Sequence, residues 1–195
     1  MELSLDLNKR YTYADYLTWF DDKARELIDG FIKMMSPAPR IRHAKVVKNI
    51  YRHFDSIITK NKGRCEVFFA PFDVRFPKNG ETAYDKIDTV VQPDICVICD
   101  LSKLDDRGCC GAPDMIVEVL SPSTAKKDLT EKFNLYEEHG VKEYWIVHPE
   151  ARSINIYLLQ KNGKYDDGIT YEFEGKVPVR IFDNYLIDLN EIFEN

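Results

Sequence analysis

The stretch Ala112–Thr124 has the sequence APDMIVEVLSPST, and AKKDLTEKFNLYEEH follows it directly at Ala125–His139. The first stretch predicts a strand buried on both faces, because its apolar run is nearly continuous until Pro122. The second predicts a helix, because leucine and aromatic residues recur at helical spacing before Gly140. A buried strand followed by such a helix predicts the centre of a mixed sheet in an α/β domain.

The sequence on either side of this pair predicts the other elements. Asp29-Gly30 between apolar runs predicts a hairpin over Glu26–Pro39. An amphipathic helix is expected at Ile41–Thr59, with an apolar face formed by Ile41, Ala44, Val47, Ile50, Phe54, Ile57 and Ile58. A short N-terminal helix is expected after Thr12, which is a candidate cap. Further strands are predicted at Cys65–Phe76, Val90–Asp100, Glu143–Glu150, Ser153–Gln160, Thr170–Phe173 and Val177–Ile181, with polar loops at 77–89 and around Gly108 and Gly111.

Length and composition indicate an ordinary globular protein. The 195 residues suit one domain, 1–195, and 44% hydrophobic with 31% charged residues is typical of soluble chains. We find no apolar run long enough for a membrane span and no signal peptide, so a cytoplasmic location is expected. The net charge of −6 argues against tight non-specific binding of nucleic acid. Basic residues nevertheless cluster within fourteen positions, either as a binding surface or as a solvated helix face: Arg40, Arg42, His43, Lys45, Lys48, Arg52 and His53.

The five cysteines are expected to be free thiols, because their number is odd and no secretion signal precedes them. Cys96 and Cys99 form a CxxC motif, and Cys109 and Cys110 lie ten residues farther on. Zinc binding is an alternative, but odd spacing on a strand turns the side chains of Cys96 and Cys99 to opposite faces.

Glu118 is the residue of the apolar strand that needs an explanation. A buried carboxylate is costly unless it is paired or binds a metal ion. Strand alternation places Glu118 on one face with Asp114, Ile116 and Leu120, opposite the face that carries Val117. Mg²⁺ and Mn²⁺ prefer oxygen ligands, so Glu118 is a candidate metal ligand. The alternative is an acid that faces outward and pairs with a lysine.

Lys132 lies at the border of the apolar face of the following helix, one turn before Tyr136. A lysine there can reach back toward the end of the preceding strand and place a cation beside a metal site. The alternative is a lysine whose aliphatic stem covers apolar surface.

Three stretches together resemble the Uma-two family of endonucleases, which is grouped with the PD-(D/E)XK restriction-endonuclease-like superfamily. They are ELIDGFIKMMSPAPRIRH, QPDICVICD and PDMIVEVLSPSTAKKDLTEKFNLYEEHGVKEYWIVHPE. The resemblance extends from about Glu26 to Phe193. It implies a restriction-endonuclease-like α/β fold, with a central mixed sheet flanked by helices, an N-terminal hairpin and extra C-terminal strands.

The resemblance also implies roles for individual residues. Asp94 would match the aspartate of PD, and Glu118 the acid of (D/E)XK. The backbone carbonyl of Val119 would be a further metal ligand. Leu120 stands where the superfamily has lysine, so Lys132 is the candidate replacement and Lys127 the second choice.

Glu26 and His43 match residues near the N-terminus of such proteins; Glu26 would complete the acid cluster and His43 would lie at its mouth. The implied function is hydrolysis of phosphodiester bonds in DNA with Mg²⁺ or Mn²⁺ as cofactor, and a homodimer would suit double-strand cleavage. The alternative, favoured by the net charge and Leu120, is a catalytically silent nucleic-acid-binding or scaffold module with the same fold.

Overall fold

The computed structural model describes residues 5–21, 23–35, 40–60, 63–121, 127–172 and 174–194, and it describes only the backbone of residues 127–129. No helix in these ranges combines the length and the apolar composition of a membrane span. The end of the predicted hairpin, at residues 36–39, and residues 122–126 between the predicted strand and helix lie outside the described residues.

A mixed sheet of six strands, here called the central sheet, contains the predicted buried strand. Its order is β12-β11-β10-β9-β6-β3. β9 and β10 pair in parallel, and the other neighbours pair antiparallel. The strands are β3 (Glu66–Phe69), β6 (Ile95–Ile98), β9 (Met115–Val119), β10 (Glu143–His148), β11 (Ser153–Leu158) and β12 (Ile169–Glu172).

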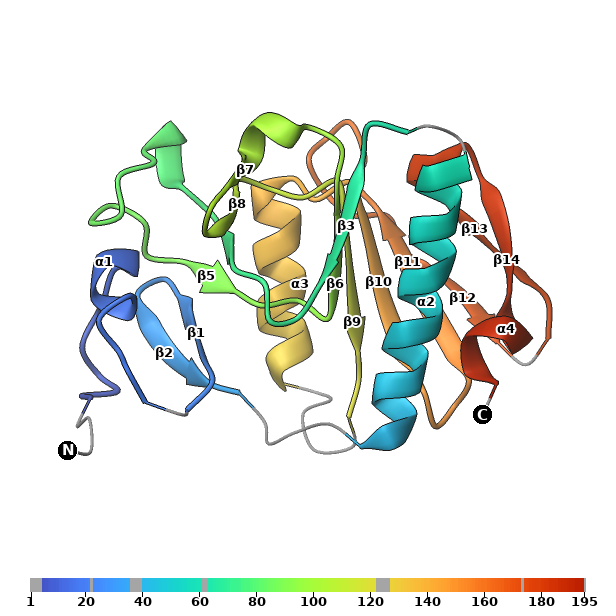
Figure 1. The fold of residues 1–195 in the computed structure, drawn as a ribbon, viewed down its shortest axis with the longest axis horizontal. Coiled ribbons are helices and arrows are strands. Elements are labelled where there is room, and N and C mark those ends of the chain that lie inside the picture. Colours follow the sequence, from blue (N-terminus) through green and yellow to red (C-terminus); the bar gives the residue numbers. More distant parts are fainter. Residues whose placement is uncertain are drawn as a thin grey trace.

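Helices cover the two faces of the central sheet (Figure 1). α2 (Ile41–Lys60) packs on one face, together with a C-terminal hairpin and a short last helix. α3 (Lys127–His139) packs on the other face. The hairpin is formed by β13 (Lys176–Val179) and β14 (Tyr185–Asp188), and the last helix is α4 (Leu189–Phe193).

The side chains of β9 alternate between the two faces of the central sheet. Met115, Val117 and Val119 lie in the core beneath α2, whereas Ile116 lies in the core beneath α3. The predicted alternation is therefore confirmed, and it places Glu118 on the α3 side.

A second six-stranded sheet, here called the N-terminal sheet, lies on the α3 side of the central sheet (Figure 1). The sequence predicted only its hairpin of β1 (Arg25–Ile28) and β2 (Phe31–Met34), which Asp29-Gly30 connects. The other strands fall in segments expected to be loops or parts of longer strands. They are β4 (Val74–Arg75), β5 (Val90–Val91), β7 (Leu104–Asp105) and β8 (Gly108–Cys110). α1 (Tyr13–Tyr16) flanks this sheet and has Thr12 as its N-cap, as predicted.

Two expectations about local structure are wrong. The segment predicted as one strand, Val90–Asp100, is divided between the two sheets, because Gln92–Asp94 interrupts it. Ile41 is 74% exposed, although the sequence predicted it on the apolar face of α2. Ile50, Phe54 and Ile57 are buried, as predicted, and Val46 joins them. The first residue of α2 extends past the core, so it has nothing to pack against.

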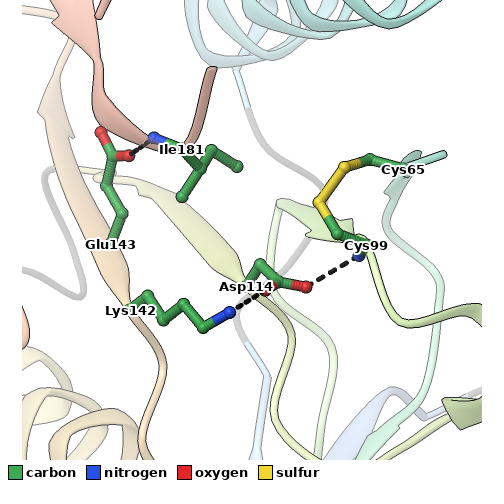
Figure 2. The surroundings of a disulfide bond; sticks show 6 residues. All are labelled: Cys65, Cys99, Asp114, Lys142, Glu143 and Ile181. Atoms are coloured by element: carbon green, nitrogen blue, oxygen red, sulfur yellow. Dashed lines mark hydrogen bonds and ion pairs between the residues drawn. A yellow bond between two sulfur atoms is a disulfide. The ribbon is translucent and has the colours of Figure 1, made fainter. Parts of the chain in front are cut away.

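The cysteines are not all free, contrary to the expectation. Cys65 and Cys99 form a disulfide with their Cα atoms 3.8 Å apart (Figure 2). In the antiparallel pair of β3 and β6, Glu66 faces Ile98, so the next positions outward are the two cysteines. Cys96 packs on the other side of the sheet, as its spacing from Cys99 predicted.

Candidate active site

Glu118 accepts two hydrogen bonds from α3 at a single oxygen. Lys132 Nζ lies 3.0 Å and Tyr136 Oη 2.6 Å from Glu118 Oε1. Residues four apart on a helix lie one above the other, so both side chains reach the same point on β9. α3 thus supplies a cation and a neutral hydroxyl donor to one carboxylate, whose side chain is only 12% exposed.

Glu26 brings a second carboxylate to Lys132 from the N-terminal sheet. It is 5% exposed, and its Oε1 lies 2.9 Å from Lys132 Nζ. The backbone N–H of Gln92 donates to the same oxygen at 2.8 Å. Lys132 therefore bridges acids from the two sheets.

Asp94 stands directly before β6 and is fixed through both carboxylate oxygens. The backbone N–H of Val119 donates to Oδ2 at 2.7 Å, and His43 Nε2 lies 3.2 Å from Oδ1. Val119 follows Glu118 in β9, so the hydrogen bond to its N–H brings Asp94 beside the second acid. The end of β9 and the starts of α2 and α3 lie at the same end of the molecule (Figure 1).

The group formed by Glu26, His43, Asp94, Glu118 and Lys132 is here called the acid cluster. Its carboxylates outnumber its lysine, and two of them act on Glu118. Burial raises the pKa of Glu118 to about 7; Lys132 opposes this rise, and the carboxylates of Asp94 and Glu26 add to it. Burial alone would lower the pKa of Lys132, but Glu118 and Glu26 raise it above its ordinary value. Burial and Glu118 raise the pKa of Tyr136, so its hydroxyl keeps the proton that it donates.

His43 comes from the first turn of α2 and closes the cluster on the Asp94 side. Burial acts to lower its pKa, but the Asp94 carboxylate and the Val119 backbone raise it above the ordinary value. Its Nδ1 is buried and has no hydrogen-bond partner in the part of the chain that the structure describes. The ring is therefore held from one side only.

The structure brings together all five side chains that the sequence analysis singled out: Glu26, His43, Asp94, Glu118 and Lys132. The side chain of Lys127, the second choice for the lysine, lies outside the described residues. Leu120 packs at the edge of the core beneath α3. By strand alternation, a lysine at position 120 would lie on the same face as Glu118, the face that α3 covers. Lys132 reaches Glu118 on this face from α3.

Two residues of the cluster were not assigned a role from the sequence. Tyr136 could have been found, because it lies one helical turn after Lys132 on the buried face. Gln92 contributes its backbone N–H, which every residue except proline carries, so no sequence pattern marks it.

Oxygen donors dominate the cluster and suit Mg²⁺ or Mn²⁺ better than a softer ion. Within the described ranges, no three histidine, cysteine, aspartate or glutamate side chains lie close enough together to hold a metal ion by themselves. An ion here would therefore need two carboxylates supplemented by a main-chain carbonyl, waters or substrate oxygens.

Comparison with solved structures gives the same architecture. One match is a crystal structure described as a "putative nuclease belonging to DUF820" from Anabaena variabilis ATCC 29413. The TM-score is 0.71 at 20% sequence identity, over 94% of this chain and 97% of that chain. The fold is thus restriction-endonuclease-like, as the sequence resemblance implied.

No curated protein matches the chain significantly. The sequence model of one family, Uma2, described as "Putative restriction endonuclease", matches residues 13–186. This match spans both sheets, both long helices and every residue of the acid cluster. The chain therefore belongs to the Uma2 family.

Proposed function

We propose that this chain is a metal-dependent endonuclease that hydrolyses phosphodiester bonds in DNA. The observation that supports it most is the position of Lys132 Nζ, 2.9 Å from Glu26 and 3.0 Å from Glu118, with Asp94 tied to the neighbouring residue Val119. Three acids and one lysine from four separate segments meet at this place. A purely structural ion pair needs only one acid for each lysine.

Mg²⁺ or Mn²⁺ fits this donor set. Asp94, Glu118 and the backbone carbonyl of Val119 would hold the ion, and their oxygens match its preference. The raised pKa of Glu118 supports the fit, because a divalent cation would offset the repulsion from Asp94 and Glu26. When bound, the ion would polarise the phosphate and lower the pKa of an attacking water.

The side chains of this protein would position and stabilise the reacting groups. Lys132 carries a positive charge next to the acids and would stabilise negative charge that develops on the phosphate oxygens. Tyr136 and Gln92 hold Glu118 and Glu26 in place through hydrogen bonds. His43 would stand at the mouth of the cluster, where it keeps Asp94 oriented.

Nucleic acid as the substrate is supported by the family and by basic side chains on and next to α2. Lys48 and Arg52 are exposed on α2, the helix that carries His43, and Arg40 is exposed directly before it. Such side chains contact phosphates without reading sequence. DNA is the substrate that we propose to test first.

The test is cleavage of supercoiled plasmid by the purified chain with Mg²⁺ or Mn²⁺. We expect nicked or linear product from the unmodified protein and none from Glu118→Gln, with circular dichroism confirming that the variant is folded. Asp114→Asn is the matched control, because it removes the charge of a buried carboxylate directly before β9, at the opposite end from Glu118. Equal cleavage by the unmodified chain and Glu118→Gln would refute the assignment.

The second candidate is a catalytically silent module that binds nucleic acid. Leu120, at the position where the superfamily has lysine, favours it. No cleavage of DNA or RNA, no heat on titration with Mn²⁺ and retained binding of an oligonucleotide would support this alternative. A homodimer remains a proposal that sedimentation velocity can test, since cutting two strands calls for two sites.

A further inference from the structure

A cavity of about 370 Å³ lies beside the acid cluster, on the side of the N-terminal segment. Its size is within the usual range for small-ligand sites. The side chains that matter for its chemistry are Tyr16, Trp19, Asp21, Lys23, Arg25 and Gln92. None of them was assigned a role by the sequence.

One residue of the cavity wall contacts the acid cluster directly. Gln92 lines the cavity, and its backbone N–H donates to Glu26 at 2.8 Å. Gln92 therefore belongs to the cavity wall and also holds an acid of the cluster, so a molecule in the cavity would lie near the place where the phosphate would bind.

Two of the charged side chains that line the cavity, Asp21 and Arg25, are paired with each other. Arg25 donates to both carboxylate oxygens of Asp21, at 2.5 and 2.6 Å. This pairing lowers the pKa of Asp21 to about 2, so both groups stay charged and bound to each other. A phosphate would have to compete with Asp21 for the guanidinium, which argues against an anion as the occupant.

The cavity is also lined by two aromatic rings and by an amide whose orientation is fixed. The rings of Tyr16 and Trp19 lie with centroids 5.5 Å apart, and the Arg25 guanidinium lies 5.8 Å from the Trp19 ring. Gln92 Nε2 donates to Tyr16 Oη at 3.3 Å and to Asp73 at 2.8 Å, which fixes the amide. Among the described residues, no hydrogen bond uses the amide oxygen of Gln92. These groups suit a flat, uncharged ring with polar edges.

We propose that this cavity binds one nucleobase of the substrate strand, next to the phosphate that the acid cluster would cleave. Trp19 would stack on the base, and the amide oxygen of Gln92 would accept a hydrogen bond from its edge. The inference rests on the proposed function, because it requires a nucleic acid strand whose phosphate binds at the acid cluster. Stacking on an aromatic side chain is sequence-tolerant, so any of the four bases would enter.

The test measures binding of a fluorescein-labelled single-stranded oligonucleotide of eight residues in EDTA, so that no cleavage interferes. We expect Trp19→Ala to weaken binding about 5- to 100-fold, which corresponds to the loss of one stacked base. Phe20→Ala is the matched control, since Phe20 is the next residue, is 91% exposed and does not line the cavity. An abasic residue moved along the oligonucleotide should weaken binding at one position in the unmodified chain and have no effect there in Trp19→Ala.

A second measurement needs no variant, in case Trp19→Ala does not fold. Trp145 is fully buried, so acrylamide quenching of tryptophan fluorescence reports mainly on Trp19. The oligonucleotide should reduce this quenching, and an oligonucleotide of abasic residues alone should not.

Unchanged quenching, equal affinity of Trp19→Ala and the unmodified chain, or no binding at all would overturn the proposal. Metal-dependent cleavage with any of these results would leave the proposed nuclease function intact. Base-dependent protection of Trp19 without cleavage would support the cavity and refute the nuclease.

Discussion

The two ends of β9 carry a similar pair of groups with opposite electrostatic behaviour. At the start, Asp114 is bound by Lys142 Nζ at 2.6 Å and by the backbone N–H of Cys99 at 2.7 Å (Figure 2). At the end, Glu118 is bound by Lys132 and Tyr136 at similar distances. Yet the pKa of Asp114 lies below its ordinary value, and that of Glu118 is raised to about 7.

The difference lies in the neighbouring acids and in the exposure of the lysine. Asp114 has no second carboxylate among the causes of its shift, whereas Asp94 and Glu26 both act on Glu118. The Lys142 side chain is 69% exposed and that of Lys132 is 14% exposed. Asp114 and its two donors stabilise the start of β9. At the other end, three carboxylates surround one lysine, so a further positive charge there would reduce the repulsion between them. Such clustering of shifted groups is typical of functional sites.

The largest expected effect is a loss of cleavage activity that distinguishes Lys132 from Lys142. We expect Lys132→Met to lower the rate of metal-dependent cleavage at least about 100-fold, because it removes the cation beside the acids. Lys142→Met should leave the rate within about twofold, since an exposed ion pair contributes little. Plasmid nicking under single-turnover conditions measures both rates.

Lys132→Met also leaves Glu26 and Glu118 facing each other without a counter-ion, so its fold must be checked by circular dichroism. Lys132→Arg keeps the charge and serves as a second variant, expected to be folded and partly active. If folded Lys132→Met cleaved within threefold of the unmodified chain, the contrast between the two ends of β9 would have no catalytic meaning.

The next largest effect is stabilisation by a metal ion, which we expect to depend on Glu118 at the end of β9 and not on Asp114 at its start. Saturation with Mn²⁺ at about 100 times its Kd should stabilise the unmodified chain by about 2.7 kcal/mol, a rise in Tm of roughly 5–10 °C. Asp114→Asn should show the same rise and Glu118→Gln none. Differential scanning fluorimetry with and without Mn²⁺ measures the shift. An equal rise in all three proteins would move the metal site away from Glu118.

The parts of the fold that the sequence predicted are those with a long or strong apolar pattern. β9 is the five-residue centre of the longer strand predicted at Ala112–Thr124, and α3 ends at His139, as predicted. Their faces were assigned correctly by alternation and helical spacing. β4 and β5 are two residues long, too short for any alternation to be visible. Ile87 is fully buried although it lies in a segment predicted as a polar loop, because one apolar residue among polar ones gives no period.

Sequence patterns alone identified a site residue only where its type differs from that of the residues around it. Glu118 stood out because a carboxylate interrupts an apolar strand. Glu26 and His43 entered only through the family resemblance, since their approach to β9 depends on packing between distant segments. The disulfide was missed for the same reason, because the register of β3 against β6 decides that Cys65 meets Cys99. That the chain folds as one domain stays a prediction.

A smaller effect is expected for the hydroxyl of Tyr136. Tyr136→Phe removes a hydrogen bond to a buried acid and should cost about 1.5 kcal/mol in the free energy of unfolding. Tyr144→Phe is the matched control, because Tyr144 is equally buried and its hydroxyl has no partner in the described part of the chain. Urea unfolding at pH 7 measures both. If the two variants lost the same stability, the bond to Glu118 would contribute nothing.

The smallest effect is the pH dependence at the start of β9. Burial acts to raise the pKa of Asp114, but Lys142 and the Cys99 N–H lower it below the ordinary 3.8. A group with a lowered pKa in the folded state contributes stability above its unfolded pKa and loses that contribution as the pH falls through its folded pKa. We therefore expect Asp114→Asn to cost about 1 kcal/mol at pH 6, and the cost to shrink below pH 4.

Urea unfolding of both proteins at pH 6 and pH 3 measures the difference. Lys142→Met separates the two donors of Asp114. An exposed lysine is screened by solvent, so this variant should lose less than about 0.5 kcal/mol at pH 6. The larger part of the Asp114 contribution would then come from the Cys99 N–H, which ties β9 to the residue after β6. A loss in Lys142→Met as large as that in Asp114→Asn would instead make the start of β9 an ion pair like that of Lys132, and the contrast between its two ends would rest on the neighbouring acids alone.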